Sequence, residues 1–181
     1  MILTNKEILN YVKTYNLIEK FNPDNLTPVG YDLTTGRFED DLNTEGGAWY
    51  NRDSFELHPK RTILIRSREV IHFPTFMIGM VYPRNTYTRL GMIIQSPLYQ
   101  PGHNTNIVYS IFNASDSSII LEKGRSYAML TFAHIKNTEA YSGKYTEDIA
   151  QDNTLELTMS STSNSSTKYS GFDESFGNLL K

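Results

Sequence analysis

The sequence predicts an all-β domain, a distorted sandwich or jelly roll, with one helix before it and a flexible arm after it. Short apolar or alternating runs recur from residue 55 onward, and turn residues separate them at intervals typical of β-sandwiches. These runs do not alternate with helical segments, as a parallel α/β sheet would require. The length of 181 residues fits a single domain with a substantial core.

One helix is expected, at the N-terminus. Thr4 and Glu7 have the spacing of a capping box, in which each side chain bonds to the backbone of the other residue. The apolar stripe of this helix consists of Ile8, Leu9 and Val12. The pattern therefore predicts a helix that ends near Tyr15.

The strands are expected between clusters of proline, glycine, asparagine and aspartate. Such clusters end strands because these residues favour turns. The expected strands are residues 62–65, 69–73, 76–82, 90–95, 106–112, 118–122 and 126–133.

The chain changes character toward its C-terminus. Eight of the ten residues 158–167 are Ser or Thr, a composition that buries too little apolar surface to become ordered. Residues 169–177 then bring back aromatic residues and glycines. We expect a β domain over residues 1–157 and a tether with a closing arm over residues 158–181. The alternative is a frayed terminus with incidental aromatic residues.

Composition excludes several classes of protein. The chain has no cysteine, which excludes a disulfide scaffold and fits a reducing compartment. Its four histidines are scattered along the sequence and no thiol accompanies them, so a zinc site is not expected. No apolar run approaches the roughly 18 residues of a membrane span. We expect a soluble, cytoplasmic protein that binds neither a membrane nor duplex nucleic acid.

Charge is unevenly distributed along the chain, whose formal net charge is −3. Residues 32–57 hold seven acidic and two basic residues, whereas residues 58–98 hold six basic residues and one acid, Glu69. A basic centre in an acidic chain suits a small phosphate-bearing ligand better than a duplex. A solvated strand face is the alternative. We favour it for Lys60, Arg61, Arg66 and Arg68.

Two motifs carry the binding chemistry. In the first, Pro83 ends a strand, and the guanidinium, amide and hydroxyl donors after it suit phosphate oxygens. These donors are Arg84, Asn85, Thr86 and Arg89. The second is the tight turn of residues 99–104, where Gly102 allows a ligand to approach the backbone closely.

Taken together, the motifs resemble the superfamily of trimeric dUTPases and dCTP deaminases. Residues 82–91 lie where that family has its phosphate loop, and residues 101–113 match the turn and strand that hold the base. The other segments that resemble the family are residues 1–8, 30–33, 123–125, 143–145, 155–157 and 171–177. The last of these resembles the glycine-rich arm that dUTPases fold over bound nucleotide.

The resemblance implies a dUTPase-like jelly roll, a homotrimer with sites between subunits, and a pyrimidine deoxynucleoside triphosphate as ligand. It also implies Mg²⁺, carried on the phosphates and not by a protein metal site. The implied phosphate-binding residues are Arg84, Asn85, Thr86 and Arg89; the base and sugar residues are Gly102, His103 and Ser110; the lid residues are Tyr145 and Phe172.

Two departures from the family pattern concern catalysis. Hydrolysis of dUTP needs a carboxylate that takes a proton from water, and at that position this chain has Gln100. Deamination of dCTP needs a glutamate, and at that position the chain has Ser110. Loss of a general base costs about 10²–10⁴ in rate. We therefore expect impaired catalysis and a cleft that binds a nucleotide or a protein partner. We interpret Asp32 as structural, with its side chain bonding to nearby backbone.

Two other hypotheses stay open. The chain could be an active dUTP diphosphatase or dCTP deaminase that uses a relocated base. The candidates for that base are His103, Asp173, Glu174, Glu39, Asp40 and Asp41. It could instead be a structural jelly-roll assembly protein whose arm threads into a neighbour.

Overall fold

The computed structural model describes residues 1–39, 49–50, 52–143 and 146–149. The chain divides into two units, Met1–Ala150 and Gln151–Lys181, and all described residues belong to the first. The arm expected over residues 158–181 lies outside the described residues. Within them, no helix is long and apolar enough to cross a membrane.

The N-terminal helix forms as predicted. Helix α1 spans Asn5–Tyr15, and the carboxylate of Glu7 accepts a hydrogen bond of 2.8 Å from the backbone N–H of Thr4. This bond completes the capping box that the sequence predicts. Ile8 is fully buried, so the apolar stripe holds the helix against the β domain.

The remainder of the described chain is mostly β-structure. The strands are β1 (Ile18–Glu19), β2 (Leu26–Thr27), β3 (Gly30–Glu39), β4 (Trp49–Tyr50), β5 (Ser54–Leu57), β6 (Thr62–His72), β7 (Met77–Pro83), β8 (Met92–Gln95), β9 (Asn104–Asn113), β10 (Ile119–Glu122), β11 (Ser126–His134) and β12 (Glu147–Asp148). A 3₁₀ turn, η1, covers Pro23–Asn25, and a five-residue helix, α2, covers Asn85–Arg89.

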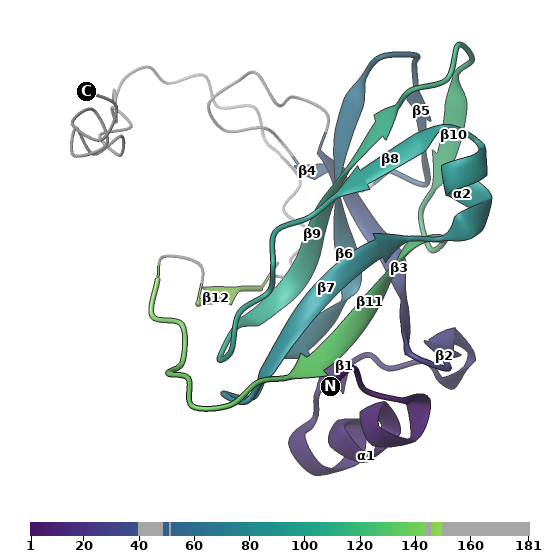
Figure 1. The fold of residues 1–181 in the computed structure, drawn as a ribbon. Helices are drawn as coiled ribbons and strands as arrows, with labels where there is room; N and C mark the ends of the chain where they lie inside the picture. The colour runs from purple at the N-terminus through teal and green to yellow at the C-terminus, as the bar shows by residue number, and fades with distance from the viewer. Residues whose placement is uncertain (40–48, 51, 144–145, 150–181) are drawn as a thin grey trace, which may run out of the picture. The chain divides into compact units, whose positions relative to one another are not determined.

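Strand β3 joins the two halves of the main sheet. The sheet has the order β12-β9-β6-β3-β11-β7, with β8 beside β9, and β10 pairs with β5 in a separate small sheet. The first half of β3 pairs with β11 as far as Thr34, and its second half pairs with β6 from Thr35 onward, with an irregularity between Thr35 and Arg37. The sheet therefore curls around its core (Figure 1), as the predicted jelly roll requires.

The core lies between the two halves of this curled sheet. Tyr31, Tyr109 and Tyr127 are almost completely buried there, together with Phe38 and Phe132. Each of these five side chains comes from β3, β9 or β11. These strands thus supply the rigid frame on which the loops are held.

The structure merges two of the predicted strands. Residues 62–65 and 69–73 belong to one strand, β6, with a bulge between Arg66 and Val70. Within the bulge, the hydroxyl of Ser67 accepts a 2.9 Å bond from the N–H of Ile107 and donates a 2.8 Å bond to the carbonyl of Glu69. These bonds satisfy backbone groups that the ladder leaves unpaired, so the strand continues through the interruption.

Candidate functional site

Helix α2 presents the predicted phosphate donors to solvent. Pro83 ends β7, Arg84 has an extended backbone at the N-cap, and the helix follows at once. Tyr87 fixes this helix, because its buried ring packs against Tyr127 with 4.7 Å between the ring centroids. The predicted donors Arg84, Asn85, Thr86 and Arg89 are all exposed.

Arg84 is held in place by two partners. Its Nε lies 3.3 Å from Oδ2 of Asp32, and its Nη1 donates a 3.2 Å bond to the carbonyl of Ser126. Burial raises the pKa of Asp32, and the guanidinium of Arg84 acts against that shift. Asp32 thus has a distant ionic partner, where we expected a bond to neighbouring backbone.

The turn before β9 is packed by the chain itself. Gly102 has a φ of +81°, which L side chains rarely adopt, and a Cβ there would lie 2.9 Å from Cβ of Ala140. The backbone N–H of Tyr141 donates a 2.8 Å bond to the carbonyl of Pro101. Residues 140–141 therefore occupy the space beside Gly102 in which we expected a ligand.

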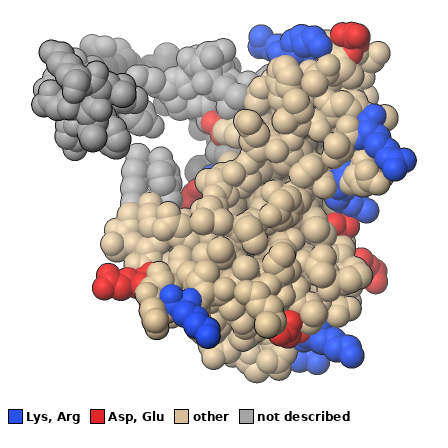
Figure 2. All heavy atoms as spheres, viewed as in Figure 1, with Lys and Arg blue, Asp and Glu red and all other residues tan. Residues whose placement is uncertain are grey.

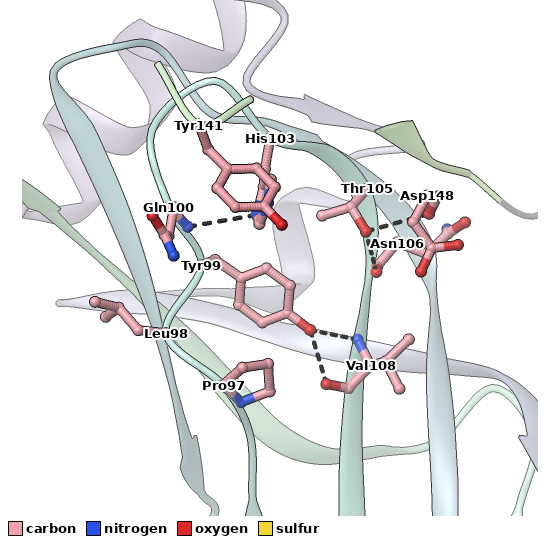
Figure 3. A pocket seen from close by; sticks show the side chains of 10 residues that line it. All are labelled: Pro97, Leu98, Tyr99, Gln100, His103, Thr105, Asn106, Val108, Tyr141 and Asp148. Carbon is pink, nitrogen blue, oxygen red and sulfur yellow. Dashed lines mark hydrogen bonds between the residues drawn. The ribbon is translucent and has the colours of Figure 1, made fainter. Parts of the chain in front are cut away.

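A pocket of about 240 Å³ lies beside this turn (Figure 3). Its wall includes the ring of His103, which meets the ring of Tyr141 edge-on at 4.4 Å between centroids, and the ring of Tyr99 at 6.2 Å. The opposite wall is β9, represented by Thr105 and Val108. The pocket is thus mainly aromatic and apolar, with Asp148 at its margin.

His103 is a poor candidate for a relocated base. Burial lowers its pKa, so the ring is neutral near pH 7. Its Nδ1 accepts a 3.4 Å bond from the backbone N–H of Gln100, which places the single ring proton on Nε2. Nε2 is buried and has no hydrogen-bond partner among the described residues. His103 can therefore donate a hydrogen bond to a ligand, but in this tautomer it cannot accept a proton at Nε2.

Ser110 lies in a second, shallower cleft of about 310 Å³ that continues from this pocket through Pro97 and Val108. Its hydroxyl donates a 3.5 Å bond to the carbonyl of Gln95. Among the described residues that line the cleft, the one ionisable side chain is Tyr109. Burial raises the pKa of Tyr109, which keeps its phenol protonated.

Glu39 lies too far from Ser110 to replace the missing carboxylate. It is paired with Leu64 across β3 and β6, and Leu64 is paired with Ser110 across β6 and β9. Two strand spacings separate Glu39 from Ser110, about 10 Å. A general base must reach its proton directly or through one water molecule. The other acidic candidates Asp40, Asp41, Asp173 and Glu174 lie outside the described residues, as do the predicted lid residues Tyr145 and Phe172.

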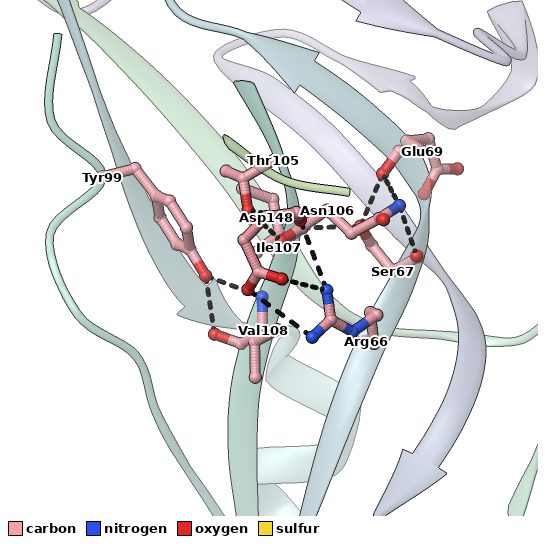
Figure 4. Close-up of polar contacts among 9 residues, drawn as sticks. All are labelled: Arg66, Ser67, Glu69, Tyr99, Thr105, Asn106, Ile107, Val108 and Asp148. Atoms are coloured by element: carbon pink, nitrogen blue, oxygen red, sulfur yellow. Dashed lines mark hydrogen bonds and ion pairs between the residues drawn. The ribbon is translucent and has the colours of Figure 1, made fainter. Parts of the chain in front are cut away.

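The basic strand face that we expected is only partly correct. Lys60, Arg61 and Arg68 are exposed, but Arg66 is buried. Its Nη1 lies 3.0 Å from Oδ1 of Asp148 (Figure 4). The hydroxyl of Thr105 donates a 3.2 Å bond to the backbone carbonyl of Asp148. Together these contacts fasten β12 to β6 and β9 at the edge of the pocket, a link that no local sequence signal indicates.

The structure separates the two predicted binding motifs within one chain. Helix α2 leads into β8, whose Met92 is paired with Asn113 at the end of β9, whereas the turn with Gly102 precedes the start of β9. The ten residues of β9 span about 30 Å at the rise of a strand. Figure 1 accordingly shows α2 and β12 at opposite ends of the sheet. One small ligand cannot reach both motifs of the same protomer.

Sequence comparisons find similar proteins over most of the chain. The dCTP deaminase-like family matches residues 2–135. A dCTP deaminase from Pyrobaculum arsenaticum is 26% identical over 160 residues, which cover 80% of this chain and 91% of that protein. A dCTP deaminase from Thermococcus kodakarensis is 30% identical over 139 residues, covering 71% of this chain and 84% of that protein.

Solved structures share the fold at low sequence identity. The 2′-deoxycytidine 5′-triphosphate deaminase from Agrobacterium tumefaciens has a TM-score of 0.62 at 14% identity; the match covers 74% of this chain but about half, 47%, of that one. A mutant dUTPase from phage phi11 of S. aureus, in a structure concerned with the coordination of a structural Mg(II) ion, has a TM-score of 0.51 at 13% identity. That match covers 70% of this chain and 90% of the phage protein.

Proposed function

This chain belongs to the dCTP deaminase-like family, and from that premise we propose that it binds a deoxynucleoside triphosphate but turns it over far more slowly than an active deaminase or diphosphatase. The relatives are named dCTP deaminases, which makes a pyrimidine nucleotide the first ligand to test. Active dUTP diphosphatase or dCTP deaminase chemistry is the alternative.

The observation that carries the proposal is the cleft around Ser110. Addition of water to a pyrimidine ring requires a group that takes and returns protons near pH 7. Neither the hydroxyl of Ser110 nor the amide of Gln100 titrates in that range. The described lining of the cleft offers a protonated Tyr109 and no carboxylate or imidazole. A base bound in this cleft would thus meet no carboxylate or imidazole on its described lining, and the carboxylate of the adjoining pocket, Asp148, is already paired with Arg66.

The donors at α2 support the binding half of the proposal. The guanidinium groups of Arg84 and Arg89 can each bond two phosphate oxygens at once. The amide of Asn85 and the hydroxyl of Thr86 are exposed on the same short helix. This set of donors suits a triphosphate.

A homotrimer would bring the two motifs together. Because about 30 Å of β9 separates them in one chain, we propose that α2 of one protomer meets the aromatic pocket of another. The face formed by β7, β8, β9 and β11 supports contact between copies, since Figure 2 shows few charged side chains on it except around its rim. Exposed Tyr82, Leu90, Ile93 and Leu98 lie in or next to β7 and β8.

Magnesium would be bound mainly through the nucleotide. Among the described residues, no group of three or more histidines or carboxylates could hold a metal ion. Mg²⁺ commonly keeps several waters and is held through substrate phosphates with few protein ligands. The donor set at α2 therefore fits an ion that arrives on the triphosphate, where it would neutralise phosphate charge.

The proposal is tested with the purified full chain. A screen of deoxynucleoside triphosphates, with and without Mg²⁺, would follow the melting temperature, and ammonia and pyrophosphate release would be measured on every nucleotide that binds. Ligand at 100 times its dissociation constant adds about 2.7 kcal/mol to the free energy of unfolding, a shift that is easily seen. Turnover of dCTP or dUTP at ordinary enzyme rates would refute the proposed impairment, and a melting temperature that no nucleotide changes would refute binding.

A further inference from the structure

The phenol of Tyr99 occupies both backbone polar groups of Val108. The Tyr99 hydroxyl donates a 2.7 Å hydrogen bond to the carbonyl of Val108 and accepts a 2.6 Å bond from its N–H (Figure 3). Both contacts lie at the pocket beside His103. They are among the shortest polar contacts of the described residues, and the sequence gives no local signal for them.

These two groups of Val108 belong to a stretch of strand edge that no strand of the described residues covers. The pairing of β8 with β9 ends at Gln95 and Ser110, and β12 pairs with β9 only at Asn104 and Thr105. In a strand, the N–H and the carbonyl of one residue point to the same side. Val108 therefore offers one donor and one acceptor side by side, and this is the kind of edge that the polar rim of a nucleobase can match.

Tyr99 is firmly held in this position. Its backbone N–H and carbonyl both bond to Gly79 at 2.9 Å, and its ring lies nearly parallel to the ring of Phe73, with 5.9 Å between centroids. Only 5% of its surface is exposed. Burial raises the pKa of Tyr99 to about 12, so the hydroxyl keeps its proton and can continue to donate at neutral pH.

We infer that Tyr99 closes the edge of β9 at Val108, so that the backbone of this strand cannot select a base by its hydrogen-bonding edge and the base is held mainly against aromatic rings. This inference rests on the proposed nucleotide binding. Hydrogen bonds to base edges carry most base discrimination, whereas stacking on aromatic rings is tolerant because every base has a π-face. Aromatic rings are present at the same pocket, because His103 and Tyr141 both line it. The ligand class is thus a deoxynucleoside triphosphate with either a purine or a pyrimidine base.

The experiment compares dissociation constants of dCTP, dUTP, dATP and dGTP, each with Mg²⁺, for the wild type and for Tyr99→Val. Valine removes the phenol and frees both groups of Val108. For the wild type we expect the four dissociation constants to agree within about threefold. For Tyr99→Val we expect them to differ by about tenfold or more, because the freed groups of Val108 can then hydrogen-bond to the edge of the base. Tyr99→Leu, which leaves less empty space, replaces the valine variant if that does not fold. Phe76→Leu, an aromatic change outside the pocket, is the control.

The outcomes separate this inference from the proposed function. A wild type that already prefers one base by about tenfold overturns the inference but leaves nucleotide binding intact. A wild type that binds no nucleotide while Tyr99→Val binds one refutes the proposed function and supports the closed edge. A folded Tyr99 variant whose base preference equals that of the wild type overturns the inference, and if both variants fail to fold, the wild-type constants alone decide it.

Discussion

The carboxylate of Asp32 on β3 lies 3.3 Å from Nε of Arg84, directly before α2. The pair joins a strand near the beginning of the chain to the helix that presents the predicted phosphate donors. Since the side chain of Asp32 is only 15% exposed, this contact fixes the guanidinium more firmly than a surface ion pair would. Arg84 is thus oriented before any ligand arrives.

The first prediction concerns these phosphate donors. We expect Arg89→Ala to weaken binding of deoxynucleoside triphosphates by about tenfold or more, because hydrogen bonds to charged groups contribute about 1.5–3 kcal/mol. Arg84→Ala alone would also leave Asp32 without its partner, so it is combined with Asp32→Asn. Isothermal titration measures the affinity, and Lys60→Ala, an exposed basic residue on another loop, is the matched control. Unchanged affinity in both arginine variants would show that α2 does not bind the triphosphate.

The second prediction concerns the missing base. Ser110→Glu places a carboxylate where the resemblance to deaminases puts their glutamate, and we expect ammonia release from dCTP to rise by about 10² or more. Ser110→Gln, of similar size but without a charge, is the control and should stay at the wild-type rate. Product analysis by chromatography distinguishes deamination from hydrolysis. Equal rates for both variants would mean that the site lacks more than a base.

The third prediction concerns the ion pair between Arg66 and Asp148. The side chain of Arg66 is 11% exposed and that of Asp148 is 38% exposed. Removal of the carboxylate leaves the more deeply buried charge without this partner, so we expect Asp148→Ala to lower the free energy of unfolding by about 1–3 kcal/mol. Arg66→Met should cost less, because water can solvate the remaining carboxylate. Urea unfolding of both variants and of the double variant measures the coupling; a larger cost for Arg66→Met would contradict the argument.

The fourth prediction concerns Glu69, which is buried in β6. Burial raises its pKa, although its carboxylate accepts a 3.0 Å bond from the N–H of Thr34 and a 3.4 Å bond from Tyr31. The carboxyl group of Glu69 therefore binds its proton more tightly in the folded state than in the unfolded state. Its contribution to the free energy of unfolding is fully present below the pKa of the unfolded state and is lost as pH rises through the pKa of the folded state.

Glu69→Gln removes this titration while keeping an acceptor for Thr34. We expect the variant to gain stability relative to the wild type as pH rises from 4 to 8, because only the wild type then has to ionise a buried carboxyl group. Unfolding in urea at several pH values measures it. Glu139→Gln, at an exposed position, is the control. A difference between variant and wild type that does not change with pH would contradict the burial argument.

Local signals determined much of the fold. The capping box at Thr4, the apolar runs of the strands and the turn glycines all act over a few residues, and the structure confirms α1 and the all-β class. The sequence also predicted the family through the order and spacing of its motifs. It did not predict α2, because these five residues carry no periodic pattern. Tyr87 stabilises the helix through distant residues: its ring packs against Tyr127 and its hydroxyl accepts a hydrogen bond from Arg125.

The candidate site depended more on tertiary structure. The sequence alone predicted the cluster of polar residues around α2 and showed that positions 100 and 110 hold Gln100 and Ser110, which are not carboxylates. The sequence did not predict that Arg66 is buried and paired with Asp148, because 82 residues separate the two. It also did not predict that Tyr99 closes the edge at Val108, because that contact depends on where β8 ends. Composition and spacing report what neighbouring residues prefer, but the partners of a buried polar group are decided by which distant strands pack together, because only that packing removes the water that would otherwise satisfy it.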